Sequence, residues 1–168
     1  MAQPSDPATS LQRPRLTPHR ALPTAAYRPG HGERPASEFP SDLPCPQGDQ
    51  WRECEPFLRG IDLYNHGFPW EAHEVWEGLW HSARRSTELV REAALLRGLI
   101  QLAAAAVLAR DARLEGARRV AQRAHHNLER AGTAPLLGLD PVELARTARD
   151  LCANPRAAHP PLHPTAAT

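Results

Sequence analysis

Apolar residues recur at intervals of three and four positions from about residue 56 onward, which is the period of an α-helix buried on one face. The pattern predicts five helices, over residues 56–66, 69–81, 87–110, 113–131 and 140–152. No segment alternates between apolar and polar residues as a half-buried strand would. We therefore expect an all-α fold, a compact bundle of about five helices.

The first two helices are expected to form a tight antiparallel hairpin that opens the bundle. Pro56 and Pro69 suit first helical positions, and Asn65 and Gly67 supply a stop between them. With so short a connection the two helices must pack against each other. The second half of the helix over 87–110 is apolar almost all round, which predicts the central position in the bundle.

Capping residues predict where the third and fifth helices start. Ser86 is a suitable N-cap for a helix beginning at Thr87. Asp140 is followed by Pro141, and Glu143 comes three residues after the cap, which is a strong helix start signal.

The ends of the chain differ in composition from this body. Ten of the 18 prolines lie before residue 47, so residues 1–50 are expected to be an extended or disordered arm. Within it, Tyr27 precedes the turn-forming pair Pro29-Gly30 and could dock on the body. The helical domain is assigned to residues 51–152, and residues 153–168 are expected to form a disordered Pro/Ala tail.

Charge and cysteine content narrow the function classes. The formal net charge of +1 gives no reason to expect nucleic acid or a membrane as partner. Cys45, Cys54 and Cys152 are few and widely spaced, so neither a disulfide framework nor a thiolate zinc site is indicated. Residues 1–10 do not resemble a secretory signal, and the longest apolar run, 99–109, is too short to cross a bilayer. We expect a cytoplasmic protein.

The helix over 69–81 carries the most distinctive chemistry. At about 100° per residue, one broad apolar arc of this helix contains Ala72, Val75, Trp76, Leu79 and Trp80. His73 and Glu77 stack at the edge of that arc. The residues expected further round, toward solvent, are Glu71, Glu74 and Gly78.

Three interpretations of His73 and Glu77 remain open. They can form a structural polar contact in a tryptophan-lined core, because buried polar groups require hydrogen-bond partners. They can bind a divalent metal, with His66, His81 or Gln101 as the third ligand. In the third interpretation His73 is a general base oriented by Glu77.

The central helix adds Arg97 and Gln101, four residues apart on an otherwise apolar surface. A buried arginine requires a partner, and Glu77 or Glu74 is the natural one. A network of these residues with His73 would disfavour a dication. Alternatively, Arg97 extends to solvent at the outer end of the helix.

Three ordered stretches resemble the bacterial and archaeal family called domain of unknown function 309. They are Gly60-Ile61-Asp62-Leu63-Tyr64-Asn65-His66-Gly67, then Glu71-Ala72-His73-Glu74-Val75-Trp76-Glu77 with Trp80, and Arg97-Gly98-Leu99-Ile100-Gln101-Leu102-Ala103. The resemblance covers about residues 55–150. It implies a compact all-helical fold, and some relatives carry the label of predicted metal-dependent hydrolase.

The resemblance also indicates where a site would lie. The residues of the motif cluster, whether binding or structural, are His73, Glu74, Glu77, Trp80, Arg97, Gln101 and Asn65. Tyr27 to Gly30 is similar to a segment before the domain in longer relatives, which implies that the arm packs near the first hairpin. We expect a structural module, or one that binds a small molecule or a partner protein. The alternative is a metal-dependent hydrolase centred on His73, Glu74 and Glu77.

Overall fold

The computed structural model describes residues 14–165, so the outermost parts of the predicted arm and tail, 1–13 and 166–168, lie outside the described residues. A short 3-10 helix, η1 (Gly48–Arg52), precedes five α-helices. These are α2 (Glu55–Asn65), α3 (Pro69–Ala83), α4 (Val90–Arg110), α5 (Leu114–Arg130) and α6 (Pro141–Ala153). No strand occurs within residues 14–165, and the predicted all-α bundle of about five helices is confirmed.

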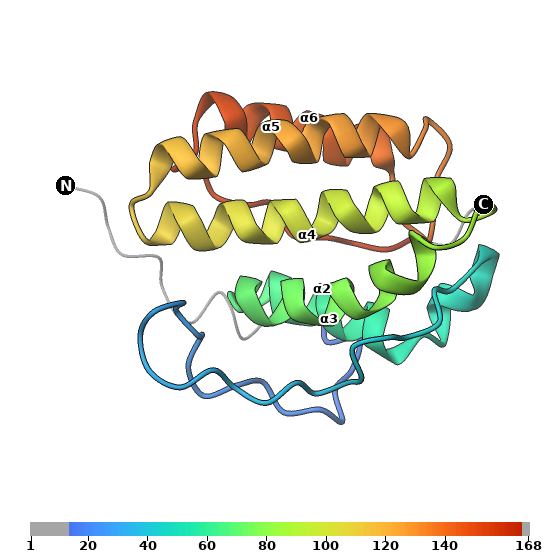
Figure 1. Ribbon diagram of the computed structural model, residues 1–168, viewed down its shortest axis with the longest axis horizontal. Helices are drawn as coiled ribbons and strands as arrows, with labels where there is room; N and C mark the ends of the chain where they lie inside the picture. Colours follow the sequence, from blue (N-terminus) through green and yellow to red (C-terminus); the bar gives the residue numbers. More distant parts are fainter. Residues whose placement is uncertain (1–13, 166–168) are drawn as a thin grey trace.

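The helices form layers around α4. In Figure 1, α5 and α6 lie on one side of α4, and the α2–α3 hairpin lies on the other. α4 packs against both α3 and α5, and α6 packs against α5. The largest apolar side chains that this arrangement buries completely include Phe57, Ile61, Trp76, Leu79, Leu95, Leu96, Leu99 and Leu128. The predicted central position of the third helix is therefore confirmed.

α4 is also long and apolar enough to cross a membrane by length and composition alone. However, 61% of its most apolar window is buried inside the bundle. The core helix of a soluble protein passes the same test, and α4 has the burial expected of one.

One predicted helix start is wrong, and another is confirmed. Ser86 does not cap α4; its hydroxyl accepts a hydrogen bond from the backbone N–H of Glu88 (3.2 Å), and the helix begins only at Val90. This local bond competes with helix formation, as serine side chains commonly do. Asp140 does cap α6, because its carboxylate accepts from the N–H groups of Val142 and Glu143.

The predicted hairpin of α2 and α3 depends on two glycines. Gly67 has a φ of 86° and ends α2, and the next N–H, of Phe68, donates to the carbonyl of Leu63 (2.8 Å). Gly60 lies directly against the indole of Trp76: a Cβ at position 60 would be 2.1 Å from Trp76 Nε1. The two helices pack this closely only because residue 60 has no side chain.

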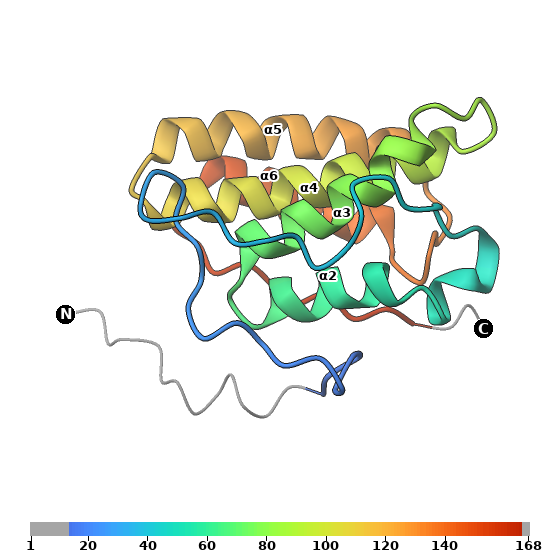
Figure 2. The same ribbon diagram turned by 60° about the horizontal axis from the view of Figure 1, so that its bottom comes forward.

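The arm crosses the outer side of the hairpin as an extended segment, which is one of the two alternatives open from the sequence (Figures 1 and 2). Asp62 on α2 binds the beginning of the described arm. The carboxylate accepts from the N–H of Leu16 (2.8 Å) and from both the N–H and the hydroxyl of Thr17 (2.7 Å each). Arg59, 1% exposed, donates twice to Glu38 and once to the carbonyl of Ala21.

The middle of the arm packs on α3 around Tyr27. Its ring meets that of Trp70 edge-on, with 4.4 Å between centroids, and its N–H donates to Glu71 (2.7 Å). Further along, the N–H of Leu43 donates to the carbonyl of Gly78 (3.1 Å). The prediction that Glu71 and Gly78 face solvent is wrong, because the arm covers that side of α3 and buries both.

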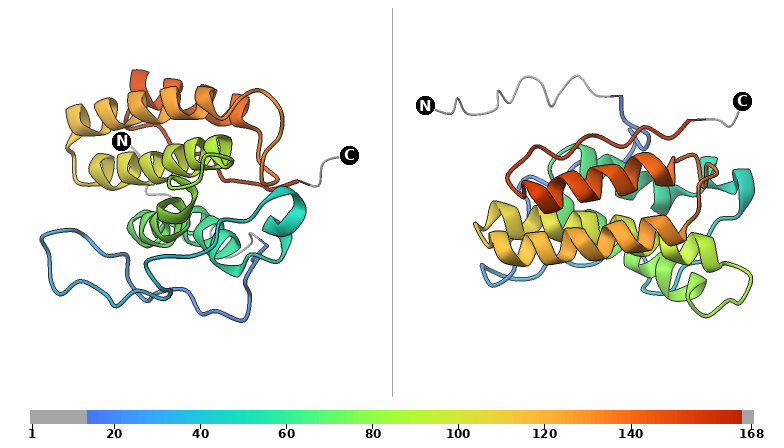
Figure 3. Two further views of the ribbon diagram at one scale, coloured as in Figure 1. Left: turned by 45° about the vertical axis from the view of Figure 1, so that its right-hand side comes forward. Right: turned by 90° about the horizontal axis from the view of Figure 1, so that it is seen from above.

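The segment after α6 differs from the disordered tail expected from its composition. Residues 154–165 return alongside α2 (Figure 3). Asn65 holds the backbone of Leu162 through two hydrogen bonds, one accepted at 2.7 Å and one donated at 2.8 Å. His159 Nδ1 pairs with the hydroxyl of Tyr64 (2.7 Å), and the side chain of Leu162 is buried. These contacts with α2 order a segment that the sequence alone leaves without a partner.

Docking of the tail is expected to weaken as the pH falls from about 6.5 towards 4. Burial lowers the pKa of His159 to about 4 from 6.5, so the docked tail disfavours the protonated ring. The free tail binds a proton through this range and the docked tail does not, so the stabilisation is lost as pH falls. Hydrogen exchange at the Leu162 amide measures this release.

A matched pair of variants controls the experiment. His159→Asn keeps a polar partner for Tyr64 but cannot titrate, and should abolish the pH step. His163→Asn changes an exposed histidine in the same tail and should leave it intact. An unchanged step in His159→Asn would assign the pH dependence to another group.

Candidate functional site

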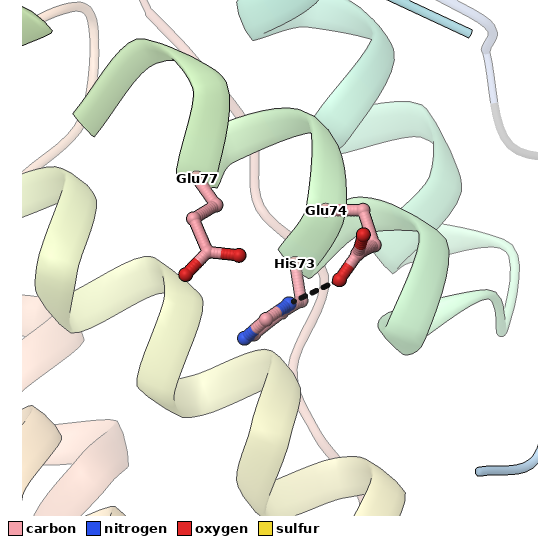
Figure 4. Close-up of side chains that lie close together, drawn as sticks. All are labelled: His73, Glu74 and Glu77. Carbon is pink, nitrogen blue, oxygen red and sulfur yellow. Dashed lines mark ion pairs between the residues drawn. The ribbon is translucent and has the colours of Figure 1, made fainter. Parts of the chain in front are cut away.

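The densest group of metal-binding side chains in the described part of the chain is His73, Glu74 and Glu77, all on α3. Each offers one ligand atom, and these three atoms lie within 4.8 Å of one another. Figure 4 shows the imidazole of His73 with a carboxylate on either side. His73 Nδ1 is 3.4 Å from Glu74 Oε1, which is an ion-pair distance without hydrogen-bond geometry. All three residues are partly buried.

The surroundings of the cluster bear on whether a metal fits. An imidazole and two carboxylates are donor types that zinc accepts. However, all three donors come from a single helix. The carboxylate of Glu74 also accepts from the guanidinium of Arg34, which lies 5.4 Å above the ring of Trp70. The arm thus already places one positive charge on the cluster.

None of the three residues suggested by the sequence as a third metal ligand, His66, His81 and Gln101, belongs to the group. His66 Nδ1 donates to the carbonyl of Asp62 (2.7 Å), and His81 Nδ1 donates to that of Ser41 (3.1 Å). Gln101 accepts from the side-chain amide of Asn127 on α5 (2.8 Å). Glu74 completes the group, as in the alternative of a hydrolase centred on His73, Glu74 and Glu77, although the angular positions placed Glu74 toward solvent.

Arg97 does not join this cluster. Its guanidinium lies 4.5 Å above the ring of Trp80, and that of Arg84 lies 5.1 Å from the same ring. Neither Glu74 nor Glu77 forms an ion pair with Arg97 among the described contacts, so the predicted four-residue network is not formed. Trp80 and Arg97 instead line a cavity of about 370 Å³.

The predicted site residues therefore fall into four separate places. His73, Glu74 and Glu77 form the cluster on α3, Trp80 and Arg97 line the cavity, and Gln101 contacts α5. Asn65 holds the tail.

Sequence reasoning missed the buried charges of the hairpin, Arg59, Asp62 and Glu71. All three are at most 9% exposed and hold the arm. A signal existed, because Arg59 and Asp62 lie on a helix whose neighbouring residues are apolar core, and buried charges there require partners. It also missed Arg84, which follows Trp80 by one helical turn.

One comparison with known proteins gives a match. Residues 57–120 match the model of a family described as Domain of unknown function (DUF309). The matched segment contains the cluster on α3 and the Trp80–Arg97 contact, and excludes the arm and the tail. No curated protein and no solved structure matches the chain.

Proposed function

We propose that the chain is a cytoplasmic, non-catalytic helical module that binds a small molecule, and that it is a member of the domain of unknown function 309 family, whose model residues 57–120 match. The observation that carries this proposal is the use of the buried polar side chains. Within the described residues these are Thr17, Arg59, Asp62, Glu71 and Gln101. The first four join the arm to the hairpin, and Gln101 joins α4 to α5. Each of these side chains therefore joins two parts of the fold, and among their buried atoms Glu71 Oε2 has no hydrogen-bond partner.

The binding side of the proposal is supported by the cavity beside Trp80 and Arg97. It is open, it lies between α3, α4 and α5, and residues of the matched family segment form much of its wall. Concave sites with a few convergent polar groups are the usual places where small molecules bind.

A second candidate function is a metal-dependent hydrolase centred on His73, Glu74 and Glu77. The proximity of three ligand atoms favours it. A metal held there would supply Lewis acidity and lower the pKa of a bound water. Against it stands Arg34, because its guanidinium would have to leave Glu74 or share that carboxylate with the ion.

Metal titration separates the two candidates. We expect protein purified without a histidine tag to contain no stoichiometric metal, and calorimetric titration with Zn²⁺ or Mn²⁺ to show no one-to-one site. Glu77→Gln should change the free energy of unfolding by no more than about 0.5 kcal/mol, because Glu77 forms no hydrogen bond in the described structure.

The opposite outcome is equally specific. One-to-one binding that is lost in both His73→Ala and Glu77→Gln, with the fold retained, would replace the binding module by the metal centre. The matched control is Glu115→Gln on α5, which removes an 80% exposed carboxylate far along the chain from the cluster.

A further inference from the structure

Three arginines and a tryptophan converge on the cavity of about 370 Å³ between α3, α4 and α5. Trp80 and Arg84 come from the end of α3, Arg97 from α4 and Arg130 from the end of α5. The cavity therefore lies at the end of the bundle where α3 connects to α4. Figure 2 shows this connection at the right.

The positive charge at this cavity is not neutralised. Arg84, Arg97 and Arg130 form no hydrogen bond and no ion pair within residues 14–165, and no carboxylate lines the cavity. Arg59 and Arg85 are paired with acidic residues. Exposed arginines such as Arg119 are also unpaired within residues 14–165, so what distinguishes the three is that they share one concave place. A guanidinium is a strong and directional hydrogen-bond donor to oxyanions, so three of them in one concave place are suited to bind an anion.

The tryptophan orders two of these groups. The guanidinium carbons of Arg97 and Arg84 lie 4.5 and 5.1 Å from the Trp80 ring centroid. Cation–π contact restricts the long side chains without using their N–H donors. The donors therefore remain free for a ligand, and less conformational entropy is lost when one binds.

The rest of the wall is apolar and determines the kind of anion. Val90, which is 54% exposed, Ala93 and Ala94 line the cavity together with the side-chain amide of Asn127. An apolar surface of this kind stabilises a carbon skeleton rather than a bare inorganic ion.

We propose that this cavity binds a small organic dianion, a phosphate monoester or a dicarboxylate with an apolar body. Arg84, Arg97 and Arg130 hold the charged group, and the Val90–Ala94 side of the cavity contacts the body. The inference rests on the proposed binding function and adds the place and the ligand class. Glu77, one turn before Trp80, does not line the cavity and leaves Arg97 free for the ligand.

Calorimetric titration of the full chain with phenyl phosphate and with phthalate tests the proposal. One of the two is expected to bind one-to-one and more tightly than either inorganic phosphate or the neutral analogue phenol. Which of them binds distinguishes a phosphate monoester from a dicarboxylate. Raising the ionic strength should weaken the binding.

Three variants locate the site. Arg97→Gln and Arg130→Gln each remove one charge-assisted contact and should weaken binding at least about tenfold. Arg130 is exposed, so its substitution should not affect folding. Arg119→Gln removes the same charge from an exposed position on α5 outside the cavity and should leave the affinity unchanged.

The outcomes separate this inference from the proposed function. Binding that is equally weakened by all three substitutions, phenol binding as tightly as the anions, or no binding of either dianion would each overturn the anion site. The proposed function is contradicted only by the metal titration, if it shows one-to-one binding of an ion that depends on both His73 and Glu77.

Discussion

Gly60→Ala is expected to lower the free energy of unfolding by about 3 kcal/mol, a large part of the roughly 5–15 kcal/mol that stabilises a small domain. The added Cβ would be 2.1 Å from Trp76 Nε1 and 2.5 Å from Trp76 Cε2. The indole cannot move aside, because Trp76 is completely buried. α2 and α3 would have to separate, and urea denaturation followed by circular dichroism measures the loss.

The same substitution at another helical glycine is the control. A Cβ at Gly116 would meet Leu108 at 3.5 Å, an ordinary contact, so Gly116→Ala should raise the free energy of unfolding by about 0.5 kcal/mol. Trp76→Phe should recover part of the loss in Gly60→Ala when the two are combined, because the smaller ring relieves the overlap. Equal effects at positions 60 and 116 would contradict this account.

Asp62→Asn is expected to cost about 3 kcal/mol of the free energy that holds the arm on the hairpin. The carboxylate is 1% exposed and accepts from the N–H groups of Leu16 and Thr17, from the Thr17 hydroxyl and from Arg15. An amide has one acceptor oxygen, and its NH₂ group would face donors. Hydrogen exchange at the Leu16 and Thr17 amides, together with proteolysis of the arm, measures the effect.

The contribution of Asp62 also has a defined pH dependence. Burial acts to raise the pKa of Asp62, but the hydrogen bonds from Leu16, Thr17 and Arg15 outweigh it and lower the pKa below its usual value of 3.8. When the arm is undocked, Asp62 therefore binds a proton at a higher pH than when it is docked, so the stabilisation is complete above about pH 4 and is lost as the pH falls below it. Asp62→Asn should remove this acid step. Asp150→Asn, at an exposed position on α6, should not.

The helices were predictable because their signals are local. Pro56, Pro69, Gly67 and Asp140 act on the residues next to them, and their effect does not depend on the rest of the fold. Ser86 shows the limit of this reasoning. Its hydroxyl accepts from the N–H of Glu88 without capping α4, and the sequence does not distinguish this bond from a helix cap.

The candidate site was harder to predict, because the angular positions of residues around one helix do not show which other segments pack against it. The angular positions correctly placed His73 and Glu77 side by side on α3. They misplaced Glu71, since the arm that covers it comes from more than forty residues away. Likewise, nothing local indicates that Arg97 faces Trp80 rather than a carboxylate.

The described parts of the arm and of the tail both attach to α2, within a single stretch of that helix. Arg59 and Asp62 hold the arm, and Tyr64 and Asn65 hold the tail. The contact between Asn65 and Leu162 spans 97 residues of sequence, so closing it carries a large loop entropy. In folding, such contacts form after the local helical hairpins. We therefore expect the arm and the tail to open and close as separate units on a formed helical body.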